Sequence, residues 1–265
     1  MASFSDGILI KKKFGQHFLR DQSVAQEMIN HVDITPESSV FEIGVGDGML
    51  TREILKKPIT RLWAFEIDPE WADYIRNTVK DPRLTVFLQD ILQLDFARLE
   101  PYKPWILLAN LPYQITFAIL YLVHQHRHLL QEAVVMIQEE VAQKIMKTHG
   151  RGYGYSSLFF QYFFDLKLLH KVPPGAFLPP PKVYSRLLYL KPKKDVAAIP
   201  HETEFWKFIK IIFHQPRRTL KNNLIQSNFN ISDLSPEILT MRAQQLTMGD
   251  FLALWDQIIK TTYSQ

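Results

Sequence analysis

A short apolar segment that leads straight into alternating glycines constrains the fold of this chain more than any other feature. The segment covers residues 40–43 and is followed by Gly44, Gly46 and Gly48. Residues 49–56 then have the pattern of a helix that begins on the glycine loop. A strand that turns through glycines into a helix is the repeating unit of α/β domains, so we expect one such unit here.

The alternation of strand and helix continues along the chain on both sides of this unit. Further apolar segments predict strands at residues 61–67, 84–88, 105–109 and 133–137. Segments with helical spacing fall at residues 21–33, 69–78, 118–124 and 141–148. Strands that alternate with helices favour a mainly parallel sheet. The sequence therefore predicts a Rossmann-like α/β domain.

A second, helical domain is predicted after residue 192. Residues 173–181 are too rich in proline for regular structure, and residues 185–190 alternate like a last strand. Beyond a short linker, helical spacing returns at residues 205–213, 216–226 and 249–261. We therefore expect an α/β domain over residues 1–192 and a small all-helical domain over residues 193–265.

The charge and the cysteine content exclude several classes of site. The chain has 31 Lys and Arg against 27 Asp and Glu, a net charge of +4 that permits a polyanionic partner without requiring one. It has no cysteine, so disulfides, thiolate metal sites and cysteine nucleophiles are excluded. No apolar stretch approaches the roughly 20 residues that span a bilayer, and no signal peptide is evident. We expect a cytoplasmic monomer that binds neither a membrane nor a metal.

Acidic residues after the second and third predicted strands indicate a nucleotide-like cofactor. Glu66 ends the strand that follows the glycine loop, where a carboxylate can accept both hydroxyls of a ribose. Asp90 follows the next strand, where it can accept from an adenine amino group. Because the carboxyl ends of parallel strands meet at one edge of a sheet, these side chains should converge with Gly44 and Gly46.

The glycine loop alone does not identify the cofactor. A strand–turn–helix corner with glycines for tight packing would explain it equally well. NAD is the competing ligand, but its Gly-x-Gly-x-x-Gly fingerprint requires a glycine where this chain has Met49. Glu42 before the loop, together with Asp90, favours S-adenosylmethionine.

The segment Asn110-Leu111-Pro112-Tyr113 follows the fourth predicted strand and indicates chemistry on an exocyclic amine of a nucleic-acid base. The lone pair of such an amine is delocalised into the ring, so acceptors on its N–H groups are needed to redirect it. The Asn110 side-chain oxygen and the Leu111 carbonyl can be these acceptors. Pro112 fixes the backbone direction and Tyr113 can stack on the base. An ordinary exit from a strand into a loop is the alternative explanation.

Ordered motifs through nearly the whole chain resemble those of the ribosomal RNA adenine N6-dimethyltransferase family (the KsgA type). They are Phe14-Gly15-Gln16-His17-Phe18-Leu19, Glu42-Ile43-Gly44 with Gly46 and Gly48, Glu66-Ile67-Asp68, Gln89-Asp90, Asn110 to Tyr113, Phe177-Leu178-Pro179-Pro180-Pro181-Lys182-Val183 with Ser185, and Phe213 to Asn222. The chain departs from the family pattern at Val45, at Gln114 to Phe117 and at Glu139, which puts the shape of the target pocket in question.

The resemblance implies a fold, a reaction and a set of site residues. The fold is a methyltransferase sheet with a reversed last strand, followed by a small helical domain. The target adenine would lie between Tyr113 and Phe177. Family members transfer methyl groups to two adjacent adenosines near the 3′ end of 16S rRNA in the small ribosomal subunit, which also implies a role in subunit biogenesis. The implied contacts to S-adenosylmethionine come from His17, Leu19, Gly44, Glu66, Asp90 and Asn110.

Two basic segments are candidates for contact with rRNA. The first is Lys11-Lys12-Lys13, although a run of charges is more often only a solvated surface. The second is Arg217, Arg218 and Lys221, which would fall near one side of the helix predicted at residues 216–226. Contacts to phosphates would position the RNA without reading its sequence.

Several aromatic residues have a structural alternative to a role in the site. His17 can be a packing residue among its apolar neighbours. Phe177 can be a core aromatic beneath the proline-rich loop instead of a stacking partner for the base. The phenylalanine-rich stretch at residues 158–164 is expected to be core, because it is a near-continuous apolar run.

Other functions stay open at the level of the sequence. A 23S rRNA methyltransferase of the erythromycin-resistance type has the same fold but tends towards Asn-Ile-Pro-Tyr, so Leu111 argues mildly against it. A non-catalytic transcription or ribosome-assembly factor can retain the fold, but the intact Glu66, Asp90 and Asn110 argue against lost catalysis. A DNA adenine methyltransferase usually begins its tetrad with Asp.

Overall fold

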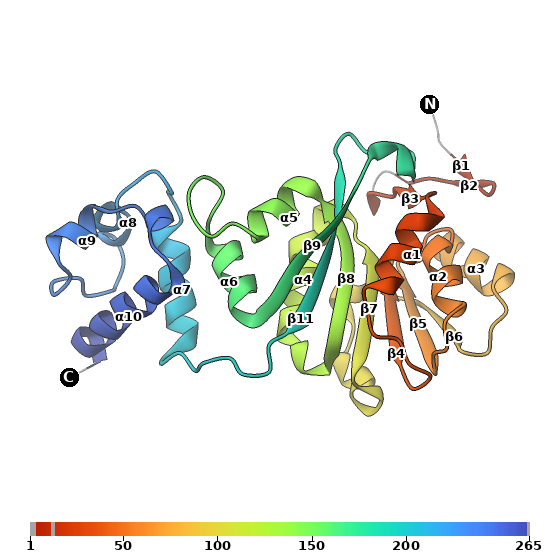
Figure 1. The fold of residues 1–265 in the computed structure, drawn as a ribbon, viewed down its shortest axis with the longest axis horizontal. Coiled ribbons are helices and arrows are strands. Elements are labelled where there is room, and N and C mark those ends of the chain that lie inside the picture. Colours follow the sequence, from red (N-terminus) through yellow and green to blue (C-terminus); the bar gives the residue numbers. More distant parts are fainter. Residues whose placement is uncertain (1–3, 12–13, 264–265) are drawn as a thin grey trace. The chain divides into compact units, whose positions relative to one another are not determined.

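The structure is a computed structural model that describes residues 4–11 and 14–263. The chain forms two compact units (Figure 1). The first contains Met1–Ala142 and Phe164–Pro192, and the second contains Gln143–Phe163 and Lys193–Gln265. The chain therefore passes into the second unit, returns to the first and leaves it again after residue 192.

A seven-stranded sheet forms the centre of the first unit, with the strand order β6-β5-β4-β7-β8-β11-β9. The pairs β4–β5, β4–β7, β5–β6 and β7–β8 are parallel, whereas β11 runs antiparallel to both β8 and β9. The predicted mainly parallel sheet with a reversed last strand is thus confirmed. The bounds are β4 (Ser39–Ile43), β5 (Arg61–Glu66), β6 (Leu84–Leu88), β7 (Trp105–Asn110), β8 (Leu130–Gln138), β9 (Phe164–Val172) and β11 (Ser185–Pro192).

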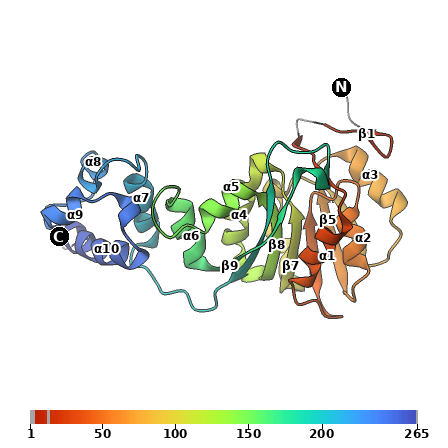
Figure 2. The same ribbon diagram turned by 45° about the horizontal axis from the view of Figure 1, so that its top comes forward.

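Helices flank this sheet. Asp21 caps the start of α1 and Asp68 caps the start of α3. The carboxylate of each accepts a backbone N–H of the first turn. Helix α1 packs beside α2 in both views (Figure 2). The helices are α1 (Gln22–Asn30), α2 (Met49–Leu55), α3 (Pro69–Thr78) and α4 (Thr116–Gln125). Helix α5 (Glu139–Ile145) begins in the first unit and ends in the second.

Short strands near the N-terminus complete the first unit. Strands β1 (Phe4–Ser5) and β2 (Ile8–Leu9) form a hairpin. Strand β3 (Phe18–Leu19) pairs antiparallel with β10 (Phe177–Leu178), so the proline-rich segment and the N-terminal segment lie side by side. This pairing was not predicted, because two residues per strand leave no pattern in a sequence.

The core of the first unit lies between α1 and the central strands. Val24, Met28 and Ile29 on α1 belong to the same buried cluster as Leu108 on β7 and Val134 on β8. Strand β4 is buried along its whole length. Strands covered on both faces have near-continuous apolar sequences, which is why these elements could be recognised without a structure.

The second unit is helical and has an aromatic core. Phe159 on α6 packs against Trp206 on α7 with ring centroids 4.9 Å apart, and Phe205 contacts Trp255 of α10 at 5.9 Å. The phenylalanine-rich stretch is therefore core, as expected. The helices are α6 (Tyr155–Phe163), α7 (Glu202–Ile212), α8 (Leu220–Leu224), α9 (Pro236–Thr240) and α10 (Met248–Tyr263).

Residues 143–163 belong to a different unit from the one that the sequence predicts. The sequence placed them in the first domain because they precede its last strands. Helix α6 instead belongs to the second unit, since its phenylalanines need the aromatic face of α7 to be buried.

Helix α8 is also shorter than the helix predicted at residues 216–226. Within the described residues, no helix is long and apolar enough to cross a membrane.

Candidate active site

A cleft opens at the carboxyl ends of β4, β5, β6 and β7. The proposed cofactor residues and the Asn-Leu-Pro-Tyr tetrad all line it: His17, Leu19, Gly44, Gly46, Glu66, Asp90, Asn110, Leu111, Pro112 and Tyr113. Residues from five separate segments thus converge where open α/β sheets place their ligands.

The glycine loop approaches the cleft with a backbone that other residues rarely adopt. Gly44, Gly46 and Gly48 have φ values of 74°, 51° and 85°. A Cβ on Gly46 would also lie 2.7 Å from the Phe18 ring. A glycine is therefore required at residue 46 both by the backbone conformation and by the N-terminal segment that packs over the loop.

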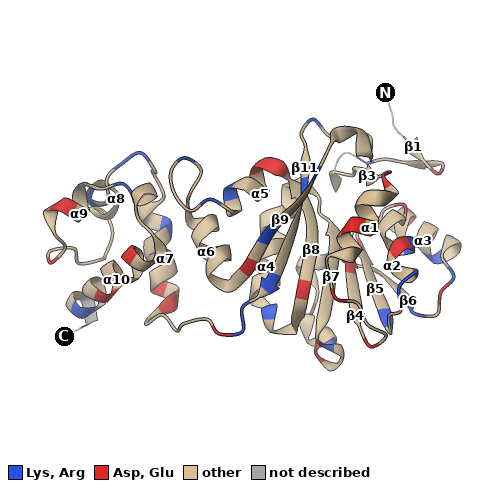
Figure 3. Ribbon diagram, viewed as in Figure 1, with Lys and Arg blue, Asp and Glu red and all other residues tan. Residues whose placement is uncertain are grey.

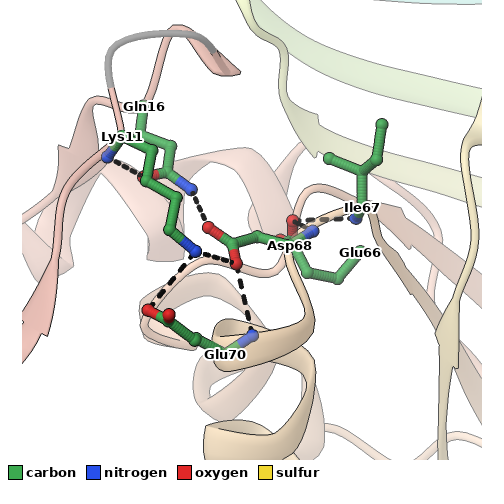
Figure 4. Close-up of polar contacts among 6 residues, drawn as sticks. All are labelled: Lys11, Gln16, Glu66, Ile67, Asp68 and Glu70. Carbon is green, nitrogen blue, oxygen red and sulfur yellow. Dashed lines mark hydrogen bonds and ion pairs between the residues drawn. The ribbon is translucent and has the colours of Figure 1, made fainter.

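Glu66 is fixed at the bottom of the cleft by backbone donors. Its Oε1 accepts the N–H groups of Ile67 and Asp68, each at 2.9 Å (Figure 4). Its Oε2 accepts the N–H of Gly46 at 3.1 Å. Burial raises the pKa of Glu66, whereas these donors oppose the rise. Each carboxylate oxygen has two lone pairs, so Oε1 is fully used and Oε2 keeps the capacity to accept one hydroxyl of a ribose.

The N-terminal strap, residues 14–19, covers one side of the cleft. Phe18 packs edge-on against Trp71 of α3, with ring centroids 4.7 Å apart. His17 is held by the Pro179 carbonyl, 2.7 Å from its Nδ1, and lies near Tyr113 with ring centroids 5.8 Å apart. The strap therefore presents His17 and Leu19 to the space beside the tetrad.

Asn110 ends β7 with its side-chain amide oriented by the strap. The Nδ2 of Asn110 donates to the His17 carbonyl at 2.9 Å. With the amino group used in this way, the Oδ1 is the acceptor that remains, and no residue in the described part of the chain donates to it. The amide is consequently oriented to accept a hydrogen bond from an amine in the cleft.

Tyr113 is held beside Asn110 by a hydroxyl pair. Its Oη and the Ser185 Oγ lie 2.7 Å apart. Burial raises the pKa of Tyr113, so the phenol stays neutral at physiological pH. In the sequence Ser185 is only part of a family motif, whereas in the structure β11 brings it next to the tetrad, where it positions the Tyr113 ring.

Phe177 lies in a different environment from the tetrad. It is 4% exposed and belongs to the buried cluster of the first unit, where it pairs with Leu19 through β10 and β3. The structure thus shows the packing alternative. A stacking role for Phe177 stays a prediction that requires the ring to be uncovered.

Glu42 is a further buried carboxyl group at the cleft. It is 1% exposed, and its Oε2 accepts a hydrogen bond from Thr51 Oγ1 at 2.7 Å. Burial raises the pKa of Glu42 to about 8, so the group is mainly protonated at neutral pH. In the sequence Glu42 serves only to favour S-adenosylmethionine over NAD as the cofactor. Its burial could not be predicted, because no sequence pattern reveals that a carboxyl group near the end of a strand is buried.

The predicted RNA-binding residues are divided between the units. Lys11 forms ion pairs with Asp68 at 2.6 Å and Glu70 at 3.3 Å, whereas Lys12 and Lys13 lie outside the described residues. The three residues predicted to bind RNA from the second unit are exposed and form no ion pair within the described part of the chain: Arg217, Arg218 and Lys221.

The two arginines do not lie on the helix that the sequence predicted. Arg217 and Arg218 occupy the turn before α8, and only Lys221 is helical (Figure 3). The helix begins later because Thr219 caps it by accepting the N–H of Asn222.

The curated relatives match this chain over almost its whole length. The ribosomal RNA small subunit methyltransferase A of Chlorobium phaeobacteroides is 37% identical over 253 residues, covering 95% of this chain and 92% of the relative. The protein of the same name from Syntrophotalea carbinolica is 35% identical, covering 91% and 94%.

Solved structures share the fold. A dimethyladenosine transferase from Plasmodium falciparum superposes with a TM-score of 0.79 at 22% identity, covering 93% of this chain and 98% of that one. The 23S rRNA methyltransferase ErmE gives a TM-score of 0.70 at 21% identity, covering 91% and 99%. The family model described as ribosomal RNA adenine dimethylase matches residues 7–260. The resemblance seen in the motifs is therefore confirmed, and the chain belongs to the ribosomal RNA adenine dimethylase family.

Proposed function

We propose that this chain uses S-adenosylmethionine to methylate the N6 amino groups of two adjacent adenosines near the 3′ end of 16S rRNA, in the small ribosomal subunit or its precursor. The observation that carries the proposal is the amide of Asn110, which is oriented by the His17 carbonyl so that its oxygen faces the same cleft as Glu66. Glu66, which would bind the cofactor, and Asn110, which would accept from the target amine, then serve one reaction centre.

The residues around the cleft fit the cofactor. The positive φ values of Gly44 and Gly46 let the backbone turn along the cleft, where both residues line the space proposed for the cofactor. Glu66 would accept a ribose hydroxyl at its Oε2, and Asp90 would accept from the adenine amino group. When bound, S-adenosylmethionine supplies an electrophilic methyl group on a sulfonium centre.

The tetrad would orient the amine that receives the methyl group. Asn110 Oδ1 accepts one N–H of the target amine, and the Leu111 carbonyl accepts the other, which directs the nitrogen lone pair out of the ring plane. Tyr113 stacks on the base and is kept in place by Ser185. Catalysis by these residues rests on positioning and on fixed dipoles.

The small-subunit target is favoured by the relatives. The curated relatives quoted above carry the name of a small-subunit enzyme and match almost the whole chain. The likeness to the 23S rRNA methyltransferase concerns the fold alone. The exposed Arg217, Arg218 and Lys221 would contact phosphates of the rRNA, and an unstacked adenine would enter the cleft. We place this monomeric enzyme in the cytoplasm.

The test is transfer of labelled methyl groups from S-adenosylmethionine to three substrates in parallel. Small subunits that lack dimethyladenosine are the expected acceptor, while large subunits and duplex DNA are the controls. Label in large subunits would assign the chain to the 23S rRNA reaction. Binding of S-adenosylmethionine without transfer to any substrate would instead support an assembly factor that retains the fold.

A further inference from the structure

Asp68 is a fully buried carboxylate that joins the N-terminal segment to the cofactor cleft. It is 0% exposed. Its Oδ1 accepts from Lys11 Nζ at 2.6 Å and its Oδ2 accepts from Gln16 Nε2 at 3.0 Å (Figure 4). Lys11 and Gln16 are also joined to each other, because the Lys11 N–H donates to Gln16 Oε1 at 2.7 Å. Two residues of the N-terminal segment thus converge on one carboxylate.

The backbone of Asp68 faces the opposite way, towards the cleft. Its N–H donates to Glu66 Oε1 at 2.9 Å, which is one of the bonds that orient the proposed ribose-binding carboxylate. The Oδ1 of Asp68 also caps α3 by accepting the N–H of Glu70 at 3.2 Å. Asp68 therefore holds the end of β5, the start of α3 and the N-terminal segment in one arrangement.

Charge and burial make this arrangement dependent on Lys11. A buried carboxylate that loses its cation is strongly disfavoured, since neither water nor another charge replaces it. The Lys11 side chain is 21% exposed, so it shields Asp68 from solvent while its ammonium stays near the surface. With Lys11 withdrawn, Asp68 would retain Gln16 and the first-turn N–H of Glu70 as donors.

Apolar contacts connect the same region to the cleft. Ile10, Phe18 and Trp71 form a separate buried cluster, and Phe18 also covers Gly46 of the glycine loop. At the other end of the strap, Asn110 donates to the His17 carbonyl. The strap is therefore attached through Asp68 to the part of the cleft where Glu66 would bind the ribose. Through Asn110 it is attached to the part where the target amine would lie.

We propose that Asp68 is a positioning residue that, with Lys11 and Gln16, latches the N-terminal strap over the cofactor cleft. This latch rests on the function proposed above, because it assumes that the cofactor ribose binds at Glu66. Closing the latch holds His17 and Leu19 at the cleft and keeps Glu66 in its binding orientation. Since linkage is reciprocal, a bound cofactor must also stabilise the closed strap.

The experiment compares variants by calorimetric binding of S-adenosylhomocysteine and by amide exchange across residues 14–19. Lys11→Met keeps the aliphatic stem and removes the ammonium, and Asp68→Asn keeps an acceptor for the α3 cap. Each should raise the Kd by about tenfold, the loss expected for one charge-assisted pair. Each should also reduce the protection that S-adenosylhomocysteine gives to the strap.

Two further variants separate a latch from a general loss of stability. Glu70→Gln removes the other, exposed carboxylate beside Lys11 and should leave the Kd within about twofold of wild type. The double variant Lys11→Met/Asp68→Asn should bind about as well as either single variant, because both changes open the same contact. The latch would be overturned if the losses of binding free energy in the two single variants added up in the double variant while the amide protection of the strap stayed unchanged. That result would mean that both residues act only on stability.

The remaining outcomes distinguish the latch from the cofactor site itself. If Lys11→Met bound S-adenosylhomocysteine like wild type and kept the protected strap, the latch would be refuted while the cofactor site would stand. If wild type failed to bind S-adenosylhomocysteine, the proposed cofactor site would be refuted and the latch with it. Lys11 lies near the surface, so this variant keeps the test decisive even if Asp68→Asn does not fold.

Discussion

The side-chain amide of Asn110 donates to the backbone carbonyl of His17 across 2.9 Å, which connects the end of β7 to a strap that lies far away in the sequence. One hydrogen bond therefore fixes which way the amide faces and also where the strap lies. The amine acceptor and one wall of the cofactor cleft are positioned together.

Asn110→Ala should slow methyl transfer by about 10²- to 10³-fold, the usual loss when one oriented dipole of a reaction centre is removed. The variant loses both the amine acceptor and the donor to His17. Single-turnover transfer to small subunits measures the rate, and filter binding should give an unchanged RNA affinity. Asn30→Ala, which removes an amide at the end of α1, is the matched control and should react like wild type. A wild-type rate for Asn110→Ala would exclude the tetrad mechanism.

Tyr113 should contribute through its ring more than through its hydroxyl. Tyr113→Ala removes the stacking surface and should lower kcat/KM by about 10- to 100-fold, the range for loss of one stacked base. Tyr113→Phe loses only the hydrogen bond to Ser185 and should cost less than about fivefold. Equal losses in the two variants would show that the ring does not stack on the target.

Arg217→Ala combined with Arg218→Ala should weaken RNA binding and flatten its dependence on salt. Each lost phosphate contact lowers the slope of log K against log salt by about 0.7 to 0.9. Lys207→Ala is the control, because Lys207 in the same unit is exposed but paired with Glu204 at 2.6 Å. An unchanged slope in the double arginine variant would remove the turn before α8 from the RNA interface.

Glu42 should make the folded protein less stable as the pH rises. Its pKa is about 8 in the folded chain, against an ordinary value of 4.5. Between these values the folded state binds more protons at this site than the unfolded state. The free energy of unfolding is therefore greatest at the acid end of this window and decreases towards pH 8, by up to about 1.4 kcal/mol per pH unit.

Urea unfolding of wild type and Glu42→Gln, from about pH 5 to about pH 8, tests this dependence on Glu42. Other buried carboxyl groups contribute to the total slope, so the difference between the two proteins isolates Glu42. Glu237→Gln, an exposed change in the second unit, should reproduce the wild-type slope. Identical slopes in wild type and Glu42→Gln would mean that the buried carboxyl does not titrate in this range.

Much of the first unit was predictable because its central parallel strands, β4 and β7, are buried on both faces and because polar residues stand at or after the ends of its parallel strands. Glu66, Asp90 and Asn110 could be assigned to one cleft from that topology alone. Strand β9 was missed, since α6 ends at Phe163 and β9 begins at Phe164 with no turn residue between them. The apolar run at residues 158–164 therefore conceals where α6 ends and β9 begins, and also where the chain returns from the second unit to the first.

Contacts between distant segments were beyond the reach of sequence patterns. Lys11 was assigned to RNA because it begins a basic run, yet its ammonium is paired with Asp68, 57 positions away. Phe177 has the sequence context of a stacking residue but lies in the core, because β10 pairs with β3. Both outcomes depend on where the N-terminal segment docks, which only tertiary packing decides.

The most direct measurement is to identify and locate the product. Small subunits that lack dimethyladenosine would be incubated with this protein and S-adenosylmethionine, and the 16S rRNA would then be digested and analysed by mass spectrometry. The account predicts N6,N6-dimethyladenosine at two adjacent positions near the 3′ end, and far less of it when Asn110→Ala is incubated for the same time. Methylation at another atom of adenine, or at a position elsewhere in the rRNA, would contradict it.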